Sequence, residues 1–488
     1  MVRKVNIVKI TRVICTYGLL TGLSTSIPSH AMNVKLINVV SEHVNVEENN
    51  NQDISTQEDN NKENNNQENN NQENSNQENN NQENNVPENN PDLDNPDDNN
   101  TEEVEEPIYT AVKDTIYVKK QSSVYEKPDT SSKKIGTATL YKKYTRVGIG
   151  DNGYDQIELE GVIAYIKSSN VTTKKPFVPT DIVDIEDKKY DYNEMKKDLQ
   201  QLNVYYPDYV TVQSIGKSSD NREIYSAVLG NPDAKKHILI QGSMHAREYI
   251  NTQLLMSQLE YYLIRYEKGT YNGVAYKKMF NEVAVHIIPM ANPDGVTLSQ
   301  YGLNGIQDKK LALSLKGMQK SSNFARWKAN AKGVDLNRNF SFGWSKEAGA
   351  SKRGSMNYAG AKAESEQETK VLVKYTKSIK GLKTVLSYHS MGNIIYWNYG
   401  QTGKLMSKSK ELVNLVKDIT GYRLVTQSSK SIPYGGYSDY VVRELGIPAV
   451  TLETGILYAP VNHSQFDTIW KQNKTIIPAV ALQVIEDN

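Results

Sequence analysis

The stretch HILIQGSMHAREY, residues 237–249, joins a short apolar run to two side chains that are able to bind a metal ion. HILIQ has the length and β-branched content of a buried strand, and the polar segment GSMHAREY follows it directly. His245 and Glu248 are three residues apart in that segment, so one loop or one helical turn can point both at a single ion. A lone His-x-x-Glu pair also occurs on ordinary surface helices, so a metal site requires ligands from elsewhere in the chain.

Further apolar runs predict additional strands of the same sheet, and helical patterns separate them. The predicted strands are VAVHIIP at 283–289, TVLSY at 384–388 and AVTL at 449–452. Strands alternating with helices indicate an α/β domain from about residue 184 to 488, with a mixed open sheet and helices on both faces. Polar residues follow each run, as expected when a site is assembled at the carboxyl ends of strands.

Two of these strand ends supply candidates for the same chemistry. His389 follows TVLSY and completes a His, Glu, His set with His245 and Glu248. Three protein ligands leave one zinc position open for water, which is typical of catalytic sites, whereas structural zinc sites have four protein ligands and favour cysteine. Glu453 follows AVTL and could act as a general base, although a strand-end acid in a salt bridge is the simpler alternative.

Six motifs occur together in an order and approximate spacing that resemble the carboxypeptidase A-like zinc metallocarboxypeptidases, peptidase family M14. They are HAREY, NPDGV at 292–296, GVDLNRNF at 333–340, SEQET at 365–369, SYHSMGN around His389 and TLETG at 451–455. The resemblance covers about residues 190–485. It implies one Zn²⁺ per chain held by His245, Glu248 and His389, with Glu453 as the catalytic carboxylate.

The resemblance also assigns residues to substrate binding. Asn337 and Arg338 match the pair that holds the free carboxylate of a terminal residue, and the planar guanidinium of arginine suits bidentate binding of a carboxylate. Arg247 matches a further arginine that lines the cleft, although it could instead pair with a structural acid.

The sequence departs from the family pattern where an arginine usually polarises the scissile carbonyl. That position falls at or next to Lys328, with Arg326 nearby. We therefore expect Lys328, or a displaced arginine, to take the catalytic role.

A second departure concerns the tyrosine that covers the substrate and the base of the side-chain pocket. Ser431 occupies the strict position of the tyrosine, so Tyr434 and Tyr437 are the candidates. The base of the pocket falls near Ser438 and Asp439, which predicts a polar pocket.

The N-terminus predicts export. Residues 1–12 are basic, the apolar run VICTYGLLTGLSTSI follows, and Ser29 and Ala31 fit a cleavage site, so residues 1–31 are expected to be a secretory signal peptide. An uncleaved membrane anchor is the alternative, but the run is short and broken by polar residues. Cys15 is the only cysteine, so the mature protein would have no disulfide. We expect a secreted protein, extracellular or associated with the cell wall, with no stable membrane anchor.

Charge divides the rest of the chain. Residues 42–106 are rich in Asn, Gln and Glu, and their 20 acidic and one basic residues give a net charge of −19. They lack apolar side chains for a core, which predicts a disordered acidic tether. Because the whole chain is neutral and residues 1–41 carry +5, the part from residue 107 onward carries +14. That excess favours an anionic surface such as a bacterial wall, or is a solvated basic face, and no motif indicates nucleic-acid binding.

Residues 108–172 predict a small all-β domain. Short runs with alternating apolar residues are separated by turn residues such as Pro128 and Gly153. SSVYEKPDTSSKKIGTATLYKKYTRV and DNGYDQIELEGVIAYIKSSNV resemble the bacterial SH3-type domains that accompany cell-wall enzymes. The resemblance implies wall binding, and the alternative is a spacer.

Together these features predict a secreted zinc metallocarboxypeptidase that hydrolyses peptide bonds near a free carboxylate. Within this fold some bacterial members with wall-binding modules cut the γ-D-glutamyl to diaminopimelate bond of peptidoglycan stem peptides, and a polar pocket suits that substrate. General digestion of extracellular peptides is the alternative. A catalytically inactive wall-binding protein is a third hypothesis, which the retention of all three ligands and Glu453 disfavours.

Overall fold

A computed structural model describes residues 106–488 except 320, 348, 426–434 and 488. The expected signal peptide and nearly all of the expected tether therefore lie outside the described residues, as do Ser431 and Tyr434.

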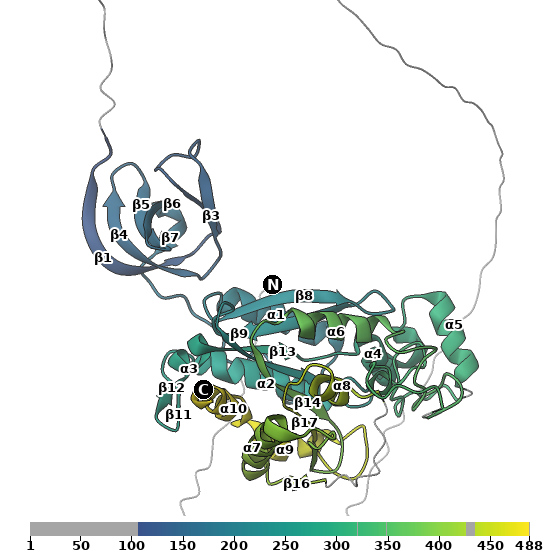
Figure 1. Cartoon of the computed structure of the whole chain (residues 1–488). Coiled ribbons are helices and arrows are strands. Elements are labelled where there is room, and N and C mark those ends of the chain that lie inside the picture. The colour runs from purple at the N-terminus through teal and green to yellow at the C-terminus, as the bar shows by residue number, and fades with distance from the viewer. Residues whose placement is uncertain (1–105, 320, 348, 426–434, 488) are drawn as a thin grey trace, which may run out of the picture. The chain divides into compact units, whose positions relative to one another are not determined.

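Residues 109–172 form a separate seven-stranded antiparallel sheet with the strand order β3-β2-β6-β5-β4-β1-β7 (Figure 1). Alternate residues point inward, and Ile116, Val124, Ile157 and Ile166 form its buried core. The strands are β1 Tyr109–Val118, β2 Ser122–Tyr125, β3 Lys134–Ala138, β4 Lys143–Gly150, β5 Tyr154–Leu159, β6 Val162–Lys167 and β7 Val171–Thr172. The all-β prediction is confirmed, and the resemblance to SH3-type domains stays a prediction.

The C-terminal part contains an eight-stranded mixed sheet with the order β16-β15-β17-β14-β10-β13-β9-β8. Its central strands β13, β10, β14 and β17 are parallel neighbours, and they match the four apolar runs that the sequence predicts as strands. The strands are β8 Val210–Lys217, β9 Glu223–Leu229, β10 Lys236–Gly242, β13 Val283–Ile288, β14 Leu382–His389, β15 Ile394–Tyr396, β16 Arg423–Leu424 and β17 Ala449–Glu453. β11 Thr270–Tyr271 and β12 Val274–Ala275 form a small hairpin.

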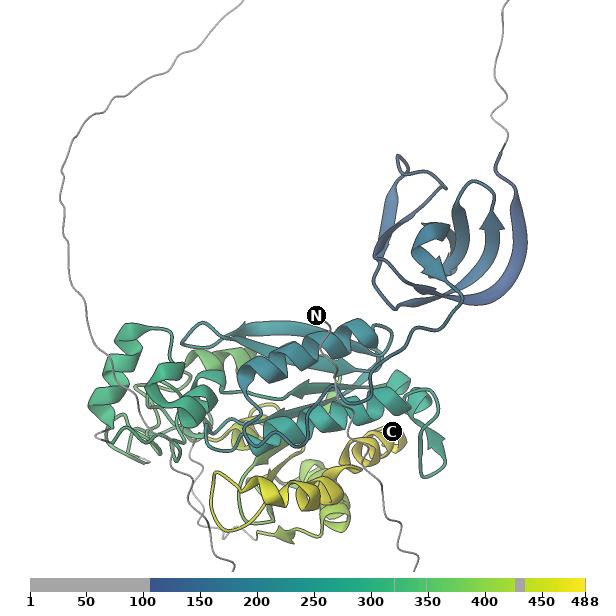
Figure 2. The same cartoon turned by 180° about the vertical axis from the view of Figure 1, so that it is seen from behind.

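Helices cover both faces of this sheet, as the sequence predicts (Figures 1 and 2). In β10, Ile238 and Ile240 pack into one core with α2 and α10, whereas Leu239 between them packs into a second core with α6 and α8. The helices are α1 Tyr192–Tyr205, α2 Ile250–Arg265, α3 Tyr276–Glu282, α4 Pro293–Tyr301, α5 Lys309–Met318, α6 Gln367–Ser378, α7 Gly403–Thr420, α8 Tyr437–Arg443, α9 Phe466–Asn473 and α10 Ile476–Glu486. Among the described residues, no helix has both the length and the apolar character needed to cross a membrane.

A buried chain of polar side chains links β10, β13 and α6. His237 Nδ1 is 2.9 Å from His286 Nε2, and His286 Nδ1 is 2.7 Å from the hydroxyl of Tyr375, which also contacts Ser226 Oγ at 2.8 Å. Burial, together with the neighbouring His237, lowers the pKa of His286 to about 3. Both rings are therefore neutral in the folded protein at neutral pH.

This pair should make the fold sensitive to acid. The folded state binds fewer protons at His286 than the unfolded chain between about pH 3 and 6.5, so stability should fall as the pH drops below about 6.5. The variant His286→Gln should lose less stability than the wild type between pH 7 and pH 5 in denaturant titrations. His463→Gln is the control and should keep the wild-type dependence. An unchanged slope in His286→Gln would assign the acid sensitivity to other groups.

Candidate active site

The candidate metal ligands lie where the central parallel strands end. His245 and Glu248 stand in the segment between β10 and α2, and His389 is the last residue of β14. β14 pairs with β10 on one side and with β17 on the other, where His389 is in register with Glu453. Because parallel strands present their carboxyl ends at one edge of a sheet, residues distant in sequence meet here.

The three side chains converge on one point. His245 Nδ1 lies 2.9 Å from Glu248 Oε1, His389 Nδ1 lies 3.0 Å from Glu248 Oε2, and the two Nδ1 atoms are 3.0 Å apart. Each residue offers a ligand atom, and these atoms all lie within 4.8 Å of one another. All three residues are at least nine-tenths buried. Two imidazole nitrogens and a carboxylate arranged in this way suit a tetrahedral cation that keeps one open position.

The charge of this cluster matches a cation. Although burial opposes ionisation of Glu248, the two histidines hold its pKa below the ordinary range. Glu248 Oε2 also accepts a hydrogen bond from the backbone N–H of Ser390 at 3.1 Å, which fixes the orientation of the carboxylate. The residues present therefore fit a zinc ion.

Asp335 is a site residue that the sequence did not reveal as one. Its Oδ1 is 3.2 Å from His245 Nε2, the ring nitrogen that faces away from the cluster, and its Oδ2 accepts a hydrogen bond from Lys328 Nζ at 2.9 Å. Burial favours the neutral acid, but Lys328 and His245 hold the pKa of Asp335 well below its ordinary value. A carboxylate on the outer nitrogen of a metal-binding histidine fixes the tautomer and orientation of the ring.

Asp335 lies within the motif GVDLNRNF, so the only signal was its place two residues before Asn337. It also precedes the short helical turn Leu336–Arg338 and accepts a hydrogen bond from the Asn337 N–H. That is ordinary helix capping, and nothing in the spacing distinguishes it from a second role.

Glu453 lies at the end of β17, beside His389 across the strand pair. Burial and the nearby Glu248 together raise its pKa to about 8, against the lowering effect of the charges of His389, Lys328 and Arg247. A carboxyl group in such surroundings is poised to exchange a proton near neutral pH.

The two cations around the expected carbonyl-polarising position differ in placement. Lys328 is largely buried, and its positive charge lowers the pKa of Glu453. The guanidinium of the exposed Arg326 instead lies 5.6 Å from the centroid of the Tyr458 ring. Arg247 is the third cation, and its Nη1 donates to the backbone carbonyl of Arg326 at 3.3 Å. Lys328 and Arg247 are therefore the cations whose charges reach Glu453.

A close backbone contact brings the start of α8 to Asn337 and Arg338. Phe340 N donates to Gly435 O at 2.9 Å, and Asn337 Oδ1 accepts from the backbone N–H of Tyr437 at 2.9 Å. Gly435 has φ of 73°, and a Cβ there would lie 2.6 Å from the carbonyl oxygen of Arg338, so only glycine fits without strain.

This contact places Asp439 near Arg338. Burial raises the pKa of Asp439 to about 6, against the lowering effect of Arg338 and Arg443. Asp439 is only partly buried, whereas the neighbouring Ser438 is buried and bonded through Oγ to Thr451 Oγ1 at 2.8 Å. Of the two predicted pocket residues, Asp439 is thus the one with a side chain available to a ligand.

The prediction of Tyr437 as a tyrosine that covers the substrate is wrong. Its side chain has no exposed surface, its hydroxyl lies 2.8 Å from Thr376 Oγ1, and its ring packs against Phe340. It belongs to the core under α8. Tyr434 lies outside the described residues and stays the remaining candidate.

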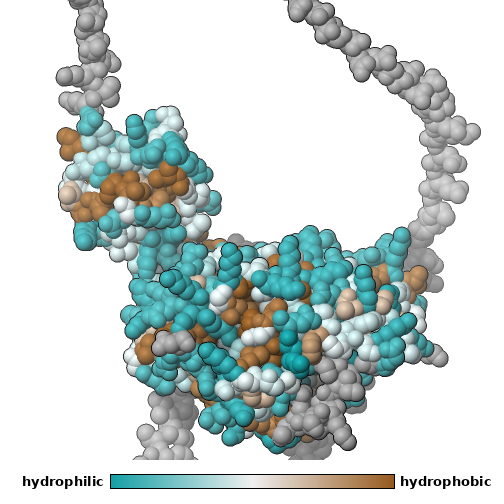
Figure 3. Space-filling model, in the orientation of Figure 1, coloured by the Kyte–Doolittle hydropathy of each residue, from teal (hydrophilic) through white to brown (hydrophobic). Residues whose placement is uncertain are grey.

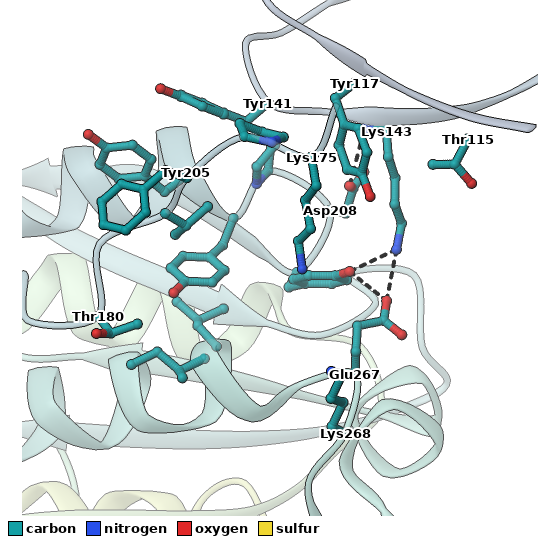
Figure 4. A pocket seen from close by; sticks show the side chains of 18 residues that line it. Thr115, Tyr117, Tyr141, Lys143, Lys175, Thr180, Tyr205, Asp208, Glu267 and Lys268 are labelled. Atoms are coloured by element: carbon teal, nitrogen blue, oxygen red, sulfur yellow. Dashed lines mark hydrogen bonds and ion pairs between the residues drawn. The ribbon is translucent and has the colours of Figure 1, made fainter. Parts of the chain in front are cut away.

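A separate cavity of about 580 Å³ lies away from this cluster (Figure 4). Tyrosines and charged side chains line it, and Lys143 Nζ contacts the hydroxyl of Tyr209 at 2.7 Å and Glu267 Oε1 at 2.8 Å. None of the candidate metal ligands contributes to its walls, so it is not the catalytic site.

A mixed α/β sheet with a His, Glu, His cluster at the carboxyl ends of its central strands defines a metal-dependent hydrolase class. Residues 195–476 match the zinc carboxypeptidase family, which is more than half of the chain. The chain therefore belongs to the zinc carboxypeptidase family, peptidase M14, whose members use one zinc.

Individual relatives agree with this assignment. The chain is 31% identical over 291 residues to gamma-D-glutamyl-L-diamino acid endopeptidase 1 of Lysinibacillus sphaericus, covering 58% of this chain and 70% of the relative. It is 30% identical to carboxypeptidase B of Rattus norvegicus over 241 residues, covering 49% and 53% of the two chains. Among solved structures, thrombin-activatable fibrinolysis inhibitor is similar in fold, with a TM-score of 0.50, 21% identity, and coverage of 68% of this chain and 90% of the other.

Zinc content and turnover should separate the proposed ligands from the proposed base. Purified protein should bind about one zinc, and the double variant His245→Ala, His389→Ala should bind none, since it leaves too few ligands for stable coordination.

Glu453→Gln should keep the zinc but lose at least about a hundredfold in kcat, as expected on removal of a general base. Metal analysis and peptide hydrolysis measure both. Near-normal turnover of Glu453→Gln would place the catalytic role on another residue.

Proposed function

We propose that this chain is an exported zinc peptidase that hydrolyses peptide bonds next to a residue with a free carboxylate, in peptidoglycan stem peptides that contain diaminopimelate. The observation that carries the proposal is the proximity of Asp439 to Arg338, whose positive charge lowers the pKa of the Asp439 carboxyl. The two side chains offer one anionic and one cationic group to the terminal residue of a substrate.

The reaction divides among the residues of the cluster. His245, Glu248 and His389 would hold the zinc, which supplies Lewis-acid activation of water and of the scissile carbonyl when it is bound. In its ionised form, which the charges of His389, Lys328 and Arg247 favour, Glu453 accepts the proton of the attacking water and returns it to the leaving nitrogen. Lys328 places a positive charge near the carbonyl oxygen, where negative charge develops in the transition state.

Asp335 and Arg338 prepare the site for that reaction. Asp335 orients His245 and holds Lys328, so one buried carboxylate positions a metal ligand and a cation. Arg338, with Asn337 beside it, binds the free carboxylate of the substrate through parallel hydrogen bonds. Arg247 adds a second positive charge near Glu453.

Asp439 supports a cationic side chain in the terminal residue. Diaminopimelate carries an amino group and a carboxyl group at the end of its side chain, and an apolar pocket would leave these groups buried without partners. The partly exposed carboxylate of Asp439 can pair with the amino group. The similarity to a gamma-D-glutamyl-L-diamino acid endopeptidase supports the same class of substrate. General digestion of peptides is the second candidate, favoured by the similarity to carboxypeptidase B.

We further propose secretion and association with the cell wall. The support is the sequence of residues 1–31, the absence of cysteine after Cys15, and the all-β domain of residues 109–172 with its resemblance to SH3-type domains.

A double-mutant cycle should test the role of Arg338. Amidating the C-terminus of a substrate should lower kcat/KM by about 10- to 100-fold in the wild type, because the bidentate contact to Arg338 is lost. In Arg338→Ala the amidation should add little further loss. Additive losses from the two changes would reject the pairing, and Lys362→Ala serves as an exposed control that should behave as the wild type.

Substrate preference should depend on Asp439. We expect a stem peptide ending in diaminopimelate to be cleaved at least about tenfold faster, in kcat/KM, than a peptide with a hydrophobic C-terminus. KM for the stem peptide should fall between pH 5 and pH 7 as Asp439, with its pKa of about 6, becomes ionised. Asp439→Asn should remove both effects while cleaving the hydrophobic peptide normally. Equal or faster cleavage of hydrophobic peptides by the wild type would favour general digestion.

Deleting residues 108–172 should separate wall binding from catalysis. The shortened protein should sediment less with isolated cell walls, yet hydrolyse small soluble stem peptides at the wild-type rate, because the cluster lies wholly within residues 245–453. Undiminished sedimentation would make the all-β domain a spacer.

A further inference from the structure

One segment of the peptidase domain carries most of the net positive charge of the chain from residue 107 onward. Residues 309–362 contain 12 basic and two acidic residues, a net charge of +10, whereas all residues from 107 onward total +14. Of the eleven basic side chains that the structure describes in this segment, eight are exposed, and we call them the basic patch. They are Lys309, Lys310, Lys316, Arg326, Lys346, Lys352, Arg353 and Lys362.

Local contacts bring the parts of this segment together. Gly354 N donates to Gly333 O at 3.0 Å, and Lys328 N donates to Ser355 O at 2.9 Å, so the chain around residue 330 runs beside the chain around residue 354. A Cβ at Gly333 would lie 2.7 Å from the sulfur of Met318 at the end of α5, and 3.2 Å from the Cβ of Arg353. Figure 1 shows α5 at one end of the peptidase domain, and Figure 3 shows hydrophilic side chains over much of that end.

Few acidic side chains of the same segment neutralise the basic patch. Within the part of the chain that the structure describes, none of its eight side chains forms an ion pair. Of the two acidic residues in the segment, Asp335 is buried against Lys328, and only Glu347 is exposed. Clustered like charges repel one another and attract an anionic partner.

We propose that residues 42–106 of the same chain bind the basic patch. Their net charge of −19 is complementary to it, and their 65 residues precede the all-β domain directly. A chain reaches at most about 3.3–3.6 Å per residue, so this segment can span up to roughly 200 Å. The peptidase domain has an expected radius of gyration of about 19 Å. The segment is therefore long enough to reach the patch.

Covalent attachment favours this partner over a separate polyanion. A linked segment is present at an effective concentration on the order of millimolar, which a free polymer seldom matches. The attraction is electrostatic and acts over a Debye length of about 8–10 Å near physiological salt, so ionic strength controls it.

The test compares two mature chains that differ only in tether charge. In one, the 20 acidic residues of 42–106 are replaced by Asn and Gln, which leaves the described peptidase domain unchanged. Binding of fluorescein-labelled poly-L-glutamate is followed by anisotropy in about 50 mM and 500 mM NaCl. The neutral-tether chain should bind the probe at least about tenfold more tightly at low salt, and the difference should vanish at high salt. If the neutral-tether chain binds no more tightly, the tether does not occupy the patch and the proposal is wrong.

Two further variants of the neutral-tether chain locate the binding. Replacing Lys309, Lys310, Lys316, Lys352 and Arg353 with Gln should abolish the gain in affinity. Replacing five exposed lysines of the all-β domain, Lys119, Lys120, Lys127, Lys133 and Lys134, should leave the gain in place. Hydrolysis of a small soluble peptide verifies that both variants are folded. A gain that survives the first set of changes, or disappears with the second, would overturn the assignment to the basic patch. Because substrate preference does not enter this test, its outcome is independent of the proposed function.

Discussion

The parallel pairing of β10, β14 and β17 in fixed register is the constraint on which the site depends. A metal cluster needs two imidazoles and a carboxylate within a few ångströms, and here they come from positions as far apart as residues 245 and 389. The buried strands bring them together because Gly242 is in register with Tyr388, and His389 with Glu453. A shift of one residue in either pairing would turn the side chains to the opposite face and separate the ligands. The apolar cores on both sides of the sheet hold that register.

The sequence predicted those features that follow a recurring apolar pattern or whose residues lie close together along the chain. The four central strands, the helices on both faces and the three converging ligands were all visible as apolar runs with polar side chains at their ends. Asp335 and Tyr437 show where this reasoning stops. Asp335 is a capping residue by its spacing, and its contact with His245 depends on a fold that joins residues 90 positions apart. Tyr437 has a suitable side chain near the expected position, but the backbone around Gly435 turns it into the core.

The charge distribution in the cleft depends on a few buried carboxylates whose surroundings differ. Glu248 is held ionised by two histidines and Asp335 by Lys328 and His245, whereas burial and the neighbouring Glu248 favour the protonated form of Glu453. Groups of one chemical type thereby acquire different charge states, which suit the separate roles proposed for them as a metal ligand, a positioning residue and a proton carrier. The difference comes from the surroundings that the fold gives each carboxylate, since all three are acids in ordinary sequence contexts.

One oxygen of the Asp335 carboxylate contacts a metal ligand, and the other contacts the lysine in the cleft. The two contacts are therefore thermodynamically linked. Oδ1 faces His245, and Oδ2 holds Lys328 together with the backbone N–H of Asn357 at 3.1 Å. If Lys328 turned toward a substrate oxygen, as the proposed mechanism requires, the negative charge of Asp335 would be less neutralised and His245 would become a stronger electron donor. Occupancy of the cleft would thus be felt at the metal without any movement of the backbone, and a substitution at residue 328 would change zinc affinity as well as turnover.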